Sequence, residues 1–192
     1  MKNPVENPIH ALLESRWSPY EFDKSKPVQS TDLASLFEAA RWAMSAYNEQ
    51  PWRYIVANRD TDKDLWNKIL NSLVEGNQPW AKHVPVLALG LVQPDFKKNG
   101  KPNPTALHDL GAASAFLTLE AQARGLAVHQ MSGILPDLVK STFSLPDTLK
   151  PVTALAIGYA GTNSELDESY AKRDSGSRVR IPLDEMLLHA SF

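Results

Sequence analysis

Cysteine is absent from the 192-residue sequence. Its absence excludes disulfide bonds, thiolate zinc sites, iron–sulfur clusters and cysteine nucleophiles. An excess of charge of one sign is missing too, because 20 Lys and Arg residues stand against 22 Asp and Glu residues, a net charge of −2. A protein that binds nucleic acid through its phosphates normally has a basic excess. We therefore expect no nucleic-acid partner.

Long apolar segments are also missing. The longest nearly continuous apolar run, residues 84–92, is under half of the ~20 residues that a membrane span requires. The first seven residues contain no apolar stretch of the kind that a secretory signal needs. With 43% apolar and 22% charged residues, the composition is that of an ordinary globular protein. We expect a soluble, cytoplasmic protein with no membrane partner.

Several common catalytic and binding motifs do not occur. The chain has neither the glycine pattern of a dinucleotide-binding Rossmann fold nor that of a P-loop. Ser132 does not stand in the G-x-S-x-G elbow of a hydrolase. The five histidines are scattered, with no pair at the helical spacing of three or four residues. We therefore predict no metal site.

Apolar periodicity predicts the helices, and runs of β-branched and aromatic residues predict the strands. The predicted helices cover residues 9–16, 30–40, 61–75, 105–124 and 183–188. The predicted strands cover residues 52–57, 84–92, 126–131 and 152–159, with one more helix between the last two. Taken alone, this alternation suggests a parallel, doubly wound sheet. We expect one domain over residues 1–162 and a C-terminal arm over residues 163–192.

Three polar segments stand out from this framework. The first is residues 16–20, the second is the amide-rich loop at residues 45–52, and the third holds Arg178 and Arg180. Singly, each has an ordinary interpretation: a basic residue at a helix end, a loop bonded to its own backbone, or a solvated arm. Together, arginines from both ends of a chain can converge on a phosphate. Asn and Gln side chains suit the alternating donor and acceptor edge of a flavin.

Residues 39–56, AARWAMSAYNEQPWRYIV, resemble the nitroreductase family of flavoproteins, whose hallmark is an A-P-S-x-x-N-x-Q-P-W-x-F loop. The segment Arg16-Trp17-Ser18, followed by Phe22, is similar to the family's N-terminal R-R-S-x-R-x-F element. Four further segments look like parts of this family in the same order: residues 76–82, 107–111, 125–133 and 178–185. The resemblance spans almost the whole chain.

The resemblance implies an α+β, three-layer fold with a mostly antiparallel sheet between helices, in place of the parallel sheet. It also implies a homodimer with FMN at the subunit interface and a C-terminal arm that crosses to the partner. NADH or NADPH would be the hydride donor. The acceptor would be a small flat molecule such as a nitroaromatic or a quinone.

The resemblance also assigns the cofactor-binding residues by position. Arg16, Arg178 and Arg180 would take the FMN phosphate, assisted by Ser18, with Trp17 and Tyr20 beside them. The other subunit would supply the residues that approach the flavin ring or ribityl chain, namely Ser45, Ala46, Asn48 and Gln50. Asn77 would contact the pyrimidine side, and the ring would be lined by Gln130, Met131, Ser132 and Gly133. No side-chain acid, base or nucleophile is needed, so no catalytic residue is predicted.

Three departures from the family pattern matter. Tyr20 replaces a basic residue, which would remove a positive charge that stabilises reduced flavin and lower the redox potential. Met44 replaces the usual proline before Ser45 and leaves that loop less rigid. Trp17 replaces a frequent Arg or His at a position that often acts through its backbone.

Two alternatives to an oxidoreductase stay open. The loss of a basic residue at Tyr20 favours a non-redox protein that binds or stores flavin on the same fold. Outside the resemblance, the small residues Gly111, Ala112 and Ala115 on the long helix are compatible with a simple interaction domain that dimerises through this helix.

Overall fold

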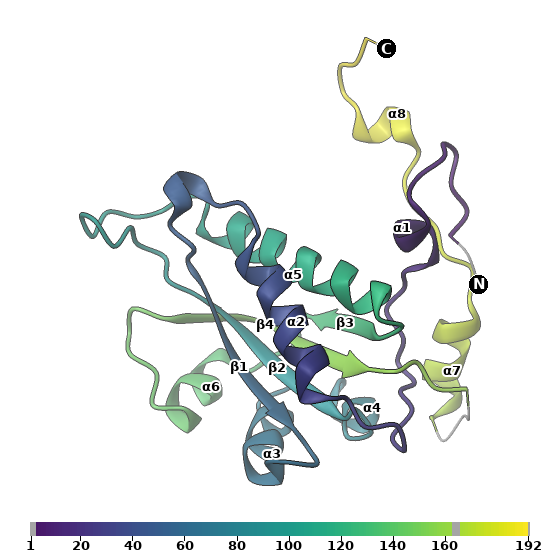
Figure 1. Cartoon of the computed structure of the whole chain (residues 1–192), viewed down its shortest axis with the longest axis horizontal. Helices are drawn as coiled ribbons and strands as arrows, with labels where there is room; N and C mark the ends of the chain where they lie inside the picture. The colour runs from purple at the N-terminus through teal and green to yellow at the C-terminus, as the bar shows by residue number, and fades with distance from the viewer. Residues whose placement is uncertain (1–2, 163–165, 192) are drawn as a thin grey trace.

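The computed structural model describes residues 3–162 and 166–191, and its centre is a four-stranded sheet (Figure 1). Its strands are β1 (Trp52–Asn58), β2 (Val86–Val92), β3 (Ala127–Met131) and β4 (Lys150–Gly158). They are ordered β1-β2-β4-β3, and every neighbouring pair is antiparallel. The antiparallel sheet implied by the family resemblance is therefore confirmed.

The parallel sheet suggested by helix–strand alternation alone is wrong. Periodicity identifies the type of each element but not where the next connection ends. The chain leaves β1 at Asn58 and enters β2 at Val86, and these two residues are paired across the sheet. The Arg59 amide also donates to the Pro85 carbonyl at 2.9 Å. The connection thus returns to the end of the sheet where it began, and β2 runs antiparallel to β1.

Helices cover both faces of the sheet and make a three-layer structure (Figure 1). One face is covered by α2 (Ser30–Arg41) and α5 (Ala106–Ala123). The other is covered by α3 (Lys63–Asn71), α4 (Gln78–Ala81) and α6 (Pro136–Thr142). Along β2, Val86 and Ala88 face the first layer, and Leu87 and Leu89 face the second. Because both faces are covered, all of β2 is buried, as its continuous apolar run predicts.

Shorter elements lie at the two ends of α5. The 3₁₀ turn η1 (Ala46–Asn48) lies at the N-terminal end of this helix, at the left of Figure 1. The helices α1 (Ala11–Ser15), α7 (Glu168–Ser175) and α8 (Leu183–Met186) lie on the other side, with both chain termini (Figure 1). The amide of Gln122 near the end of α5 donates to the Ser15 hydroxyl at 3.2 Å.

Several boundaries differ from the prediction. The helix predicted to reach Gly76 ends at Asn71, because Leu73 leaves it to pair with Ile134 as an isolated β-bridge. The helix predicted over residues 30–40 is α2, which begins at Ser30 with Gln29 as its N-cap residue and extends to Arg41. The helix α7 was not predicted at all. The boundary predicted between the domain and the C-terminal arm, between residues 162 and 163, falls at residues 163–165, which lie outside the described residues.

No helix within the described ranges combines the length and the apolar character needed to cross a membrane.

Candidate flavin-binding site

Positive charge from both ends of the chain gathers at one place. Arg16 follows α1, whereas Arg178 and Arg180 lie in the extended segment after α7. Burial lowers the pKa of the Arg16 guanidinium, and the positive charges of Arg180 and Arg178 lower it further. Arg16 Nη1 also donates to Ser18 Oγ at 3.4 Å. The structure therefore brings these four predicted phosphate ligands together within one protomer.

Asn3 ties the two chain ends to each other at this cluster. Its amide nitrogen donates to the carbonyls of Leu13 and Arg16 at 2.9 and 3.0 Å. Its amide oxygen accepts from Arg178 Nη1 at 2.9 Å. The Arg178 guanidinium lies over the Trp17 ring, 5.0 Å from its centroid, so Trp17 acts here through its side chain. Sequence reasoning missed Asn3, because no motif includes it.

This cluster suits a phosphate group. Like charges that lie close together repel one another, and a dianion that accepts hydrogen bonds from them relieves the repulsion. Guanidinium groups are planar donors whose geometry matches phosphate oxygens, and the exposed Ser18 hydroxyl adds another donor. The chemistry of the donors therefore fits the phosphate end of FMN.

The second predicted part of the site, the loop at residues 45–50, has an unusual backbone. Tyr47, Asn48 and Gln50 have φ angles of 53°, 57° and 51°, in the left-handed region. Asn tolerates this region well, but each such non-glycine residue generally costs about 1–3 kcal/mol. Ser45 Oγ accepts from the Gln50 amide at 3.1 Å and the Ser45 carbonyl accepts from the Asn48 amide at 3.1 Å. Ser45 therefore shapes the loop through both groups.

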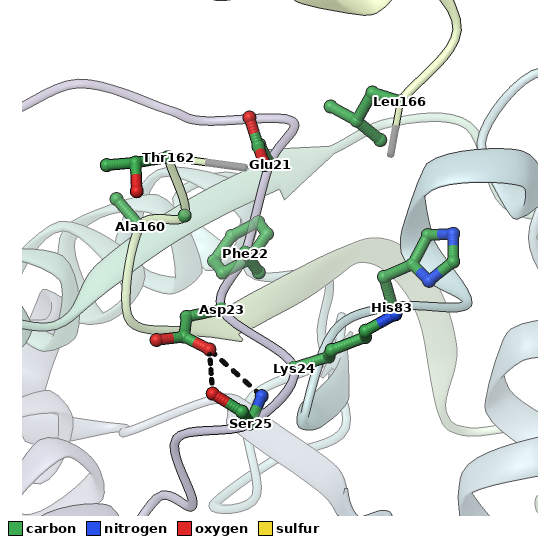
Figure 2. A pocket seen from close by; sticks show the side chains of 10 residues that line it. Glu21, Phe22, Asp23, Lys24, Ser25, His83, Ala160, Thr162 and Leu166 are labelled. Carbon is green, nitrogen blue, oxygen red and sulfur yellow. Dashed lines mark hydrogen bonds between the residues drawn. The ribbon is translucent and has the colours of Figure 1, made fainter. Parts of the chain in front are cut away.

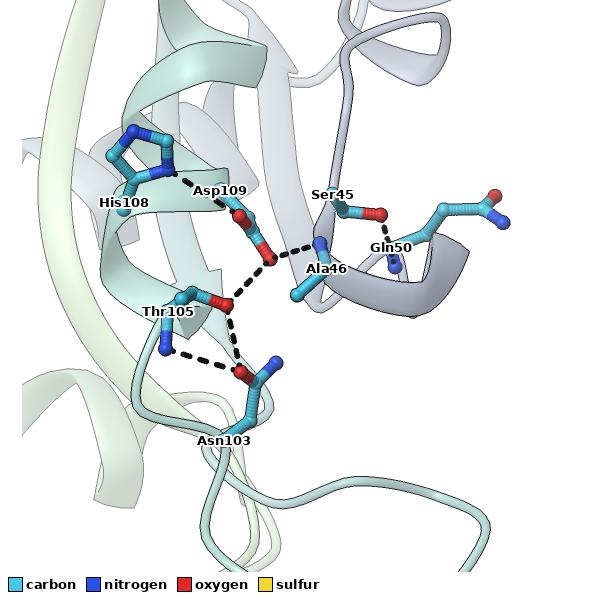
Figure 3. A network of polar contacts seen from close by, with 7 residues as sticks. All are labelled: Ser45, Ala46, Gln50, Asn103, Thr105, His108 and Asp109. Atoms are coloured by element: carbon cyan, nitrogen blue, oxygen red, sulfur yellow. Dashed lines mark hydrogen bonds and ion pairs between the residues drawn. The ribbon is translucent and has the colours of Figure 1, made fainter.

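A buried carboxylate reaches the same loop from α5 (Figure 3). Asp109 Oδ2 accepts from the Ala46 amide at 3.2 Å and from Thr105 Oγ1 at 3.4 Å. Its other oxygen lies 3.4 Å from His108 Nδ1. Asn103 Oδ1 accepts from the Thr105 amide and hydroxyl at 3.1 and 2.9 Å. The sequence includes Asp109 only as one position of the family-like segment 107–111 and gives no sign of this role.

Asn77 and Gly133, both predicted to contact the flavin, are in contact with each other. Asn77 Nδ2 donates to the Gly133 carbonyl at 3.1 Å, and the Val74 amide donates to the same oxygen at 3.1 Å. A Cβ atom at Gly133 would overlap Asn77 Nδ2 and lie 2.7 Å from Val74 Cγ2. Only glycine therefore allows this approach of the two segments.

The other residues of the 130–133 segment have different environments. The Gln130 amide nitrogen donates to the Ser114 carbonyl at 3.2 Å and to Thr118 Oγ1 at 3.0 Å, so it contacts α5. Met131 is buried in the core between the sheet and the α3, α4 and α6 layer. Ser132 is exposed and Gly133 is half-buried. Gln130 is exposed as well, so within this segment only Met131 is buried.

Tyr20 packs in an aromatic cluster that joins α7 to the body. Its ring centroid lies 5.2 Å from that of Trp80, 4.7 Å from that of His129 and 5.3 Å from that of Tyr170. Arg173 Nη1 donates to the Tyr20 hydroxyl at 3.3 Å. The position that is basic in the family pattern thus holds a structural aromatic here, and Arg173 brings a positive charge beside it.

Arg16, Ser18, Arg178 and Arg180 form what we call the phosphate cluster. Within one protomer this cluster lies far from the loop at residues 45–50. Asp109, which bonds the loop, and Gln122, which bonds the residue preceding Arg16, are both on α5. The 13 residues from one to the other correspond to about 20 Å of helix. One protomer therefore does not bring these two parts of the predicted site together.

A pocket outside the predicted site lies between residues 21–25, His83 and residues 160–162 (Figure 2). Hydrogen bonds from the hydroxyl and amide of Ser25 lower the pKa of the Asp23 carboxyl there. None of the residues predicted to bind FMN lines this pocket.

Comparisons with known proteins agree with the fold and the residue pattern. The Nitroreductase family model matches residues 13–159. The major NAD(P)H-flavin oxidoreductase of Aliivibrio fischeri is 29% identical, with 88% of this chain and 94% of that protein covered.

Solved structures give the same result. A crystal structure described as an oxidoreductase containing FMN is 34% identical, with a TM-score of 0.86 over 95% of this chain and 91% of that one. A nitroreductase family protein from Clostridium difficile 630 is 25% identical, with a TM-score of 0.70 over 94% of this chain and 97% of that one. The chain belongs to the nitroreductase family.

Proposed function

We propose that this protein is an FMN-dependent oxidoreductase that transfers hydride from NADH or NADPH to a small flat acceptor, such as a nitroaromatic or a quinone. The observation that carries the proposal is the convergence of Arg16, Arg178, Arg180 and Ser18 in a chain of this family. Relatives described as an NAD(P)H-flavin oxidoreductase and as an oxidoreductase containing FMN support it.

Different residues would bind different parts of the cofactor. The arginines and Ser18 hold the phosphate, while Asn48, Gln50 and the Ala46 segment present amide groups to the ring or ribityl chain. Asn77 and the exposed end of the 130–133 segment offer polar and backbone groups along the ring. When bound, FMN supplies the two-electron chemistry, accepting hydride from the nicotinamide and passing it to the acceptor. The protein holds the flavin, tunes its electronics and admits flat molecules to it.

We propose further that the working unit is a homodimer. The phosphate cluster and the loop are separated by about 20 Å of helix within one chain, so a second copy is needed to join them. The outer face of α5 is suited to this contact, because Leu107, Gly111 and Ala115 follow one another at four-residue spacing and are all exposed. The arm adds apolar side chains, with Val179 and Leu188 exposed by 76% and 84%. In this arrangement, the part of the arm that follows Arg180 crosses to the partner, because α7 and Arg178 contact their own protomer.

The Gly111→Arg variant tests this dimer. No atom lies within 4 Å of a Cβ placed at Gly111, so the isolated protomer accommodates the larger side chain. We expect sedimentation velocity to show the wild type as a dimer and the variant as a monomer, with unchanged circular dichroism and reduced flavin content. Gly111→Ala is the matched control and should remain dimeric. A Gly111→Arg dimer that keeps its full flavin content would show that this face of α5 is not the interface.

An absorption spectrum of the purified protein, recorded before and after anaerobic addition of NADH and then NADPH, tests the function. We expect a yellow flavin band that one or both nucleotides bleach, and an added quinone or nitroaromatic that restores it. A band that persists with both donors would favour the non-redox flavin-binding alternative. A protein that stays colourless after incubation with FMN would contradict both.

A further inference from the structure

The loop at residues 45–50 needs support from outside itself. Three of its non-glycine residues, Tyr47, Asn48 and Gln50, have left-handed backbone angles, and such conformations persist when the surroundings fix them. The loop also lacks the proline that is usual before Ser45 in this family, where Met44 stands instead. Its internal hydrogen bonds alone do not attach it to the sheet and helices.

Side-chain contacts attach the loop to neighbouring segments. One is the hydrogen bond from the Ala46 amide to Asp109 Oδ2 on α5, at 3.2 Å. A second joins Glu49 Oε1 to the amide of Lys97, at 2.7 Å, in the surface segment that follows β2. Lys97 Nζ also donates to the Glu49 carbonyl at 3.4 Å, and Arg53 Nη1 donates to the Gln50 carbonyl at 3.0 Å, both from exposed side chains. The Tyr47 ring centroid lies 6.0 Å from that of Phe96. Lys97 is exposed, so water competes with the second contact. Asp109 is only 3% exposed, and a charge-assisted hydrogen bond is stronger where water is excluded.

The burial of Asp109 is itself unusual. Among the residues that the structure describes, it is the only charged side chain in the buried class. Burying a carboxylate is unfavourable unless it is hydrogen-bonded, and the bonds of Asp109 are directed at the loop and at Thr105. Thr105 is in turn fixed by Asn103, whose own amide nitrogen is buried without a hydrogen-bond partner in the described structure. Thr105 is the N-cap residue of α5 and Asp109 lies in its first turn, where the helix dipole favours a negative charge.

We propose that Asp109 is a positioning residue for the cofactor site. Its carboxylate holds the Ala46 amide and thereby keeps the strained loop in the conformation that presents Asn48 and Gln50. The consequence for the cofactor rests on the proposed function, in which this loop contacts FMN. The effect of Asp109 on the conformation of the loop does not depend on any cofactor.

Hydrogen–deuterium exchange on the full-length protein, with and without FMN, tests the proposal. In Asp109→Ala, we expect amide exchange in residues 44–51 to be about tenfold to a hundredfold faster and FMN affinity to fall by a similar factor, as for the loss of a hydrogen bond to a charged group. Asp109→Asn keeps an acceptor for the Ala46 amide and should restore both values to within about threefold of the wild type. Glu49→Ala, which removes the exposed contact to Lys97, should change neither by more than about threefold.

The outcomes separate this proposal from the proposed function. Unchanged exchange in residues 44–51 of Asp109→Ala would overturn the positioning role, whatever the protein binds. If amide exchange in Asp109→Ala became faster by the same factor in the loop and in β2, the positioning role would also be overturned, because Asp109 would then stabilise the fold in general. A third outcome is that exchange in Asp109→Ala is faster only in the loop while the wild type binds no FMN. That result would support the role of Asp109 in fixing the loop, but it would contradict the proposed function and the role in cofactor binding.

Discussion

The double variant Arg178→Ala, Arg180→Ala is expected to bind FMN about 10²- to 10⁴-fold more weakly than the wild type. A hydrogen bond to a charged group contributes about 1.5–3 kcal/mol, and two guanidinium groups are removed together. Arg16 would remain, with a less lowered pKa, because the two positive charges that act on it would be gone. Titration of the flavin-free protein with FMN, followed by the quenching of flavin fluorescence, measures this loss.

Riboflavin provides the sharpest comparison for this variant, because it carries the same ring without the phosphate. The double variant should bind riboflavin about as well as the wild type does. Lys172→Ala is a matched control, since Lys172 on α7 forms an exposed ion pair with Glu168 at 2.7 Å, away from the arginines. Equal losses of FMN and riboflavin affinity in the double variant would mean that these arginines stabilise the arm rather than bind phosphate.

Gly133→Ala is expected to lower both stability and cofactor affinity. The added Cβ would overlap Asn77 Nδ2 and press on Val74 Cγ2, so Asn77 must leave the Gly133 carbonyl. Overpacking of this kind costs about 1–3 kcal/mol. For a chain of this size, a loss of about 2 kcal/mol lowers the melting temperature by about 4–8 °C, which differential scanning calorimetry detects.

The neighbouring Gly76 supplies the control for that variant. No atom lies within 4 Å of a Cβ placed at Gly76, and its backbone has no positive φ. Gly76→Ala should therefore leave the melting temperature unchanged or raise it slightly, through the lower entropy of the unfolded chain. If Gly133→Ala were as stable as Gly76→Ala and bound FMN normally, the contact between Asn77 and Gly133 would have no role in the site.

The elements with the strongest local patterns could be predicted from the sequence. The continuous apolar run of β2 and the small-residue stripe of α5, closed by Gly125 at φ 75°, were both found close to their observed bounds. Strand direction could not be found this way, because it depends on the path of residues 59–85 between β1 and β2 and not on any local period. The family resemblance supplied that information.

The residues of the proposed cofactor site likewise differ in whether the sequence alone could identify them. Arg16, Arg178 and Arg180 could be identified because each lies in a segment that resembles the family. Asn3, Arg173 and Asp109 act through contacts with distant parts of the chain, and no spacing in the sequence records such contacts. Tyr20 was read as a lost positive charge, whereas its role in joining α7 to Trp80 and His129 appears only in three dimensions.

The joining of the two chain ends at the phosphate cluster has a consequence for biosynthesis. The Asn3 side chain meets Arg178 across 175 residues of sequence. A ribosome releases the chain from its N-terminus onwards, so Arg16 and Ser18 emerge long before Arg178 and Arg180 exist. Contacts of such long range also form slowly, because a long loop must close before they can be made. The phosphate cluster is therefore among the last features of the protein to be completed. On the proposed function, a nascent chain holds only Arg16 and Ser18 of the groups that would bind the FMN phosphate.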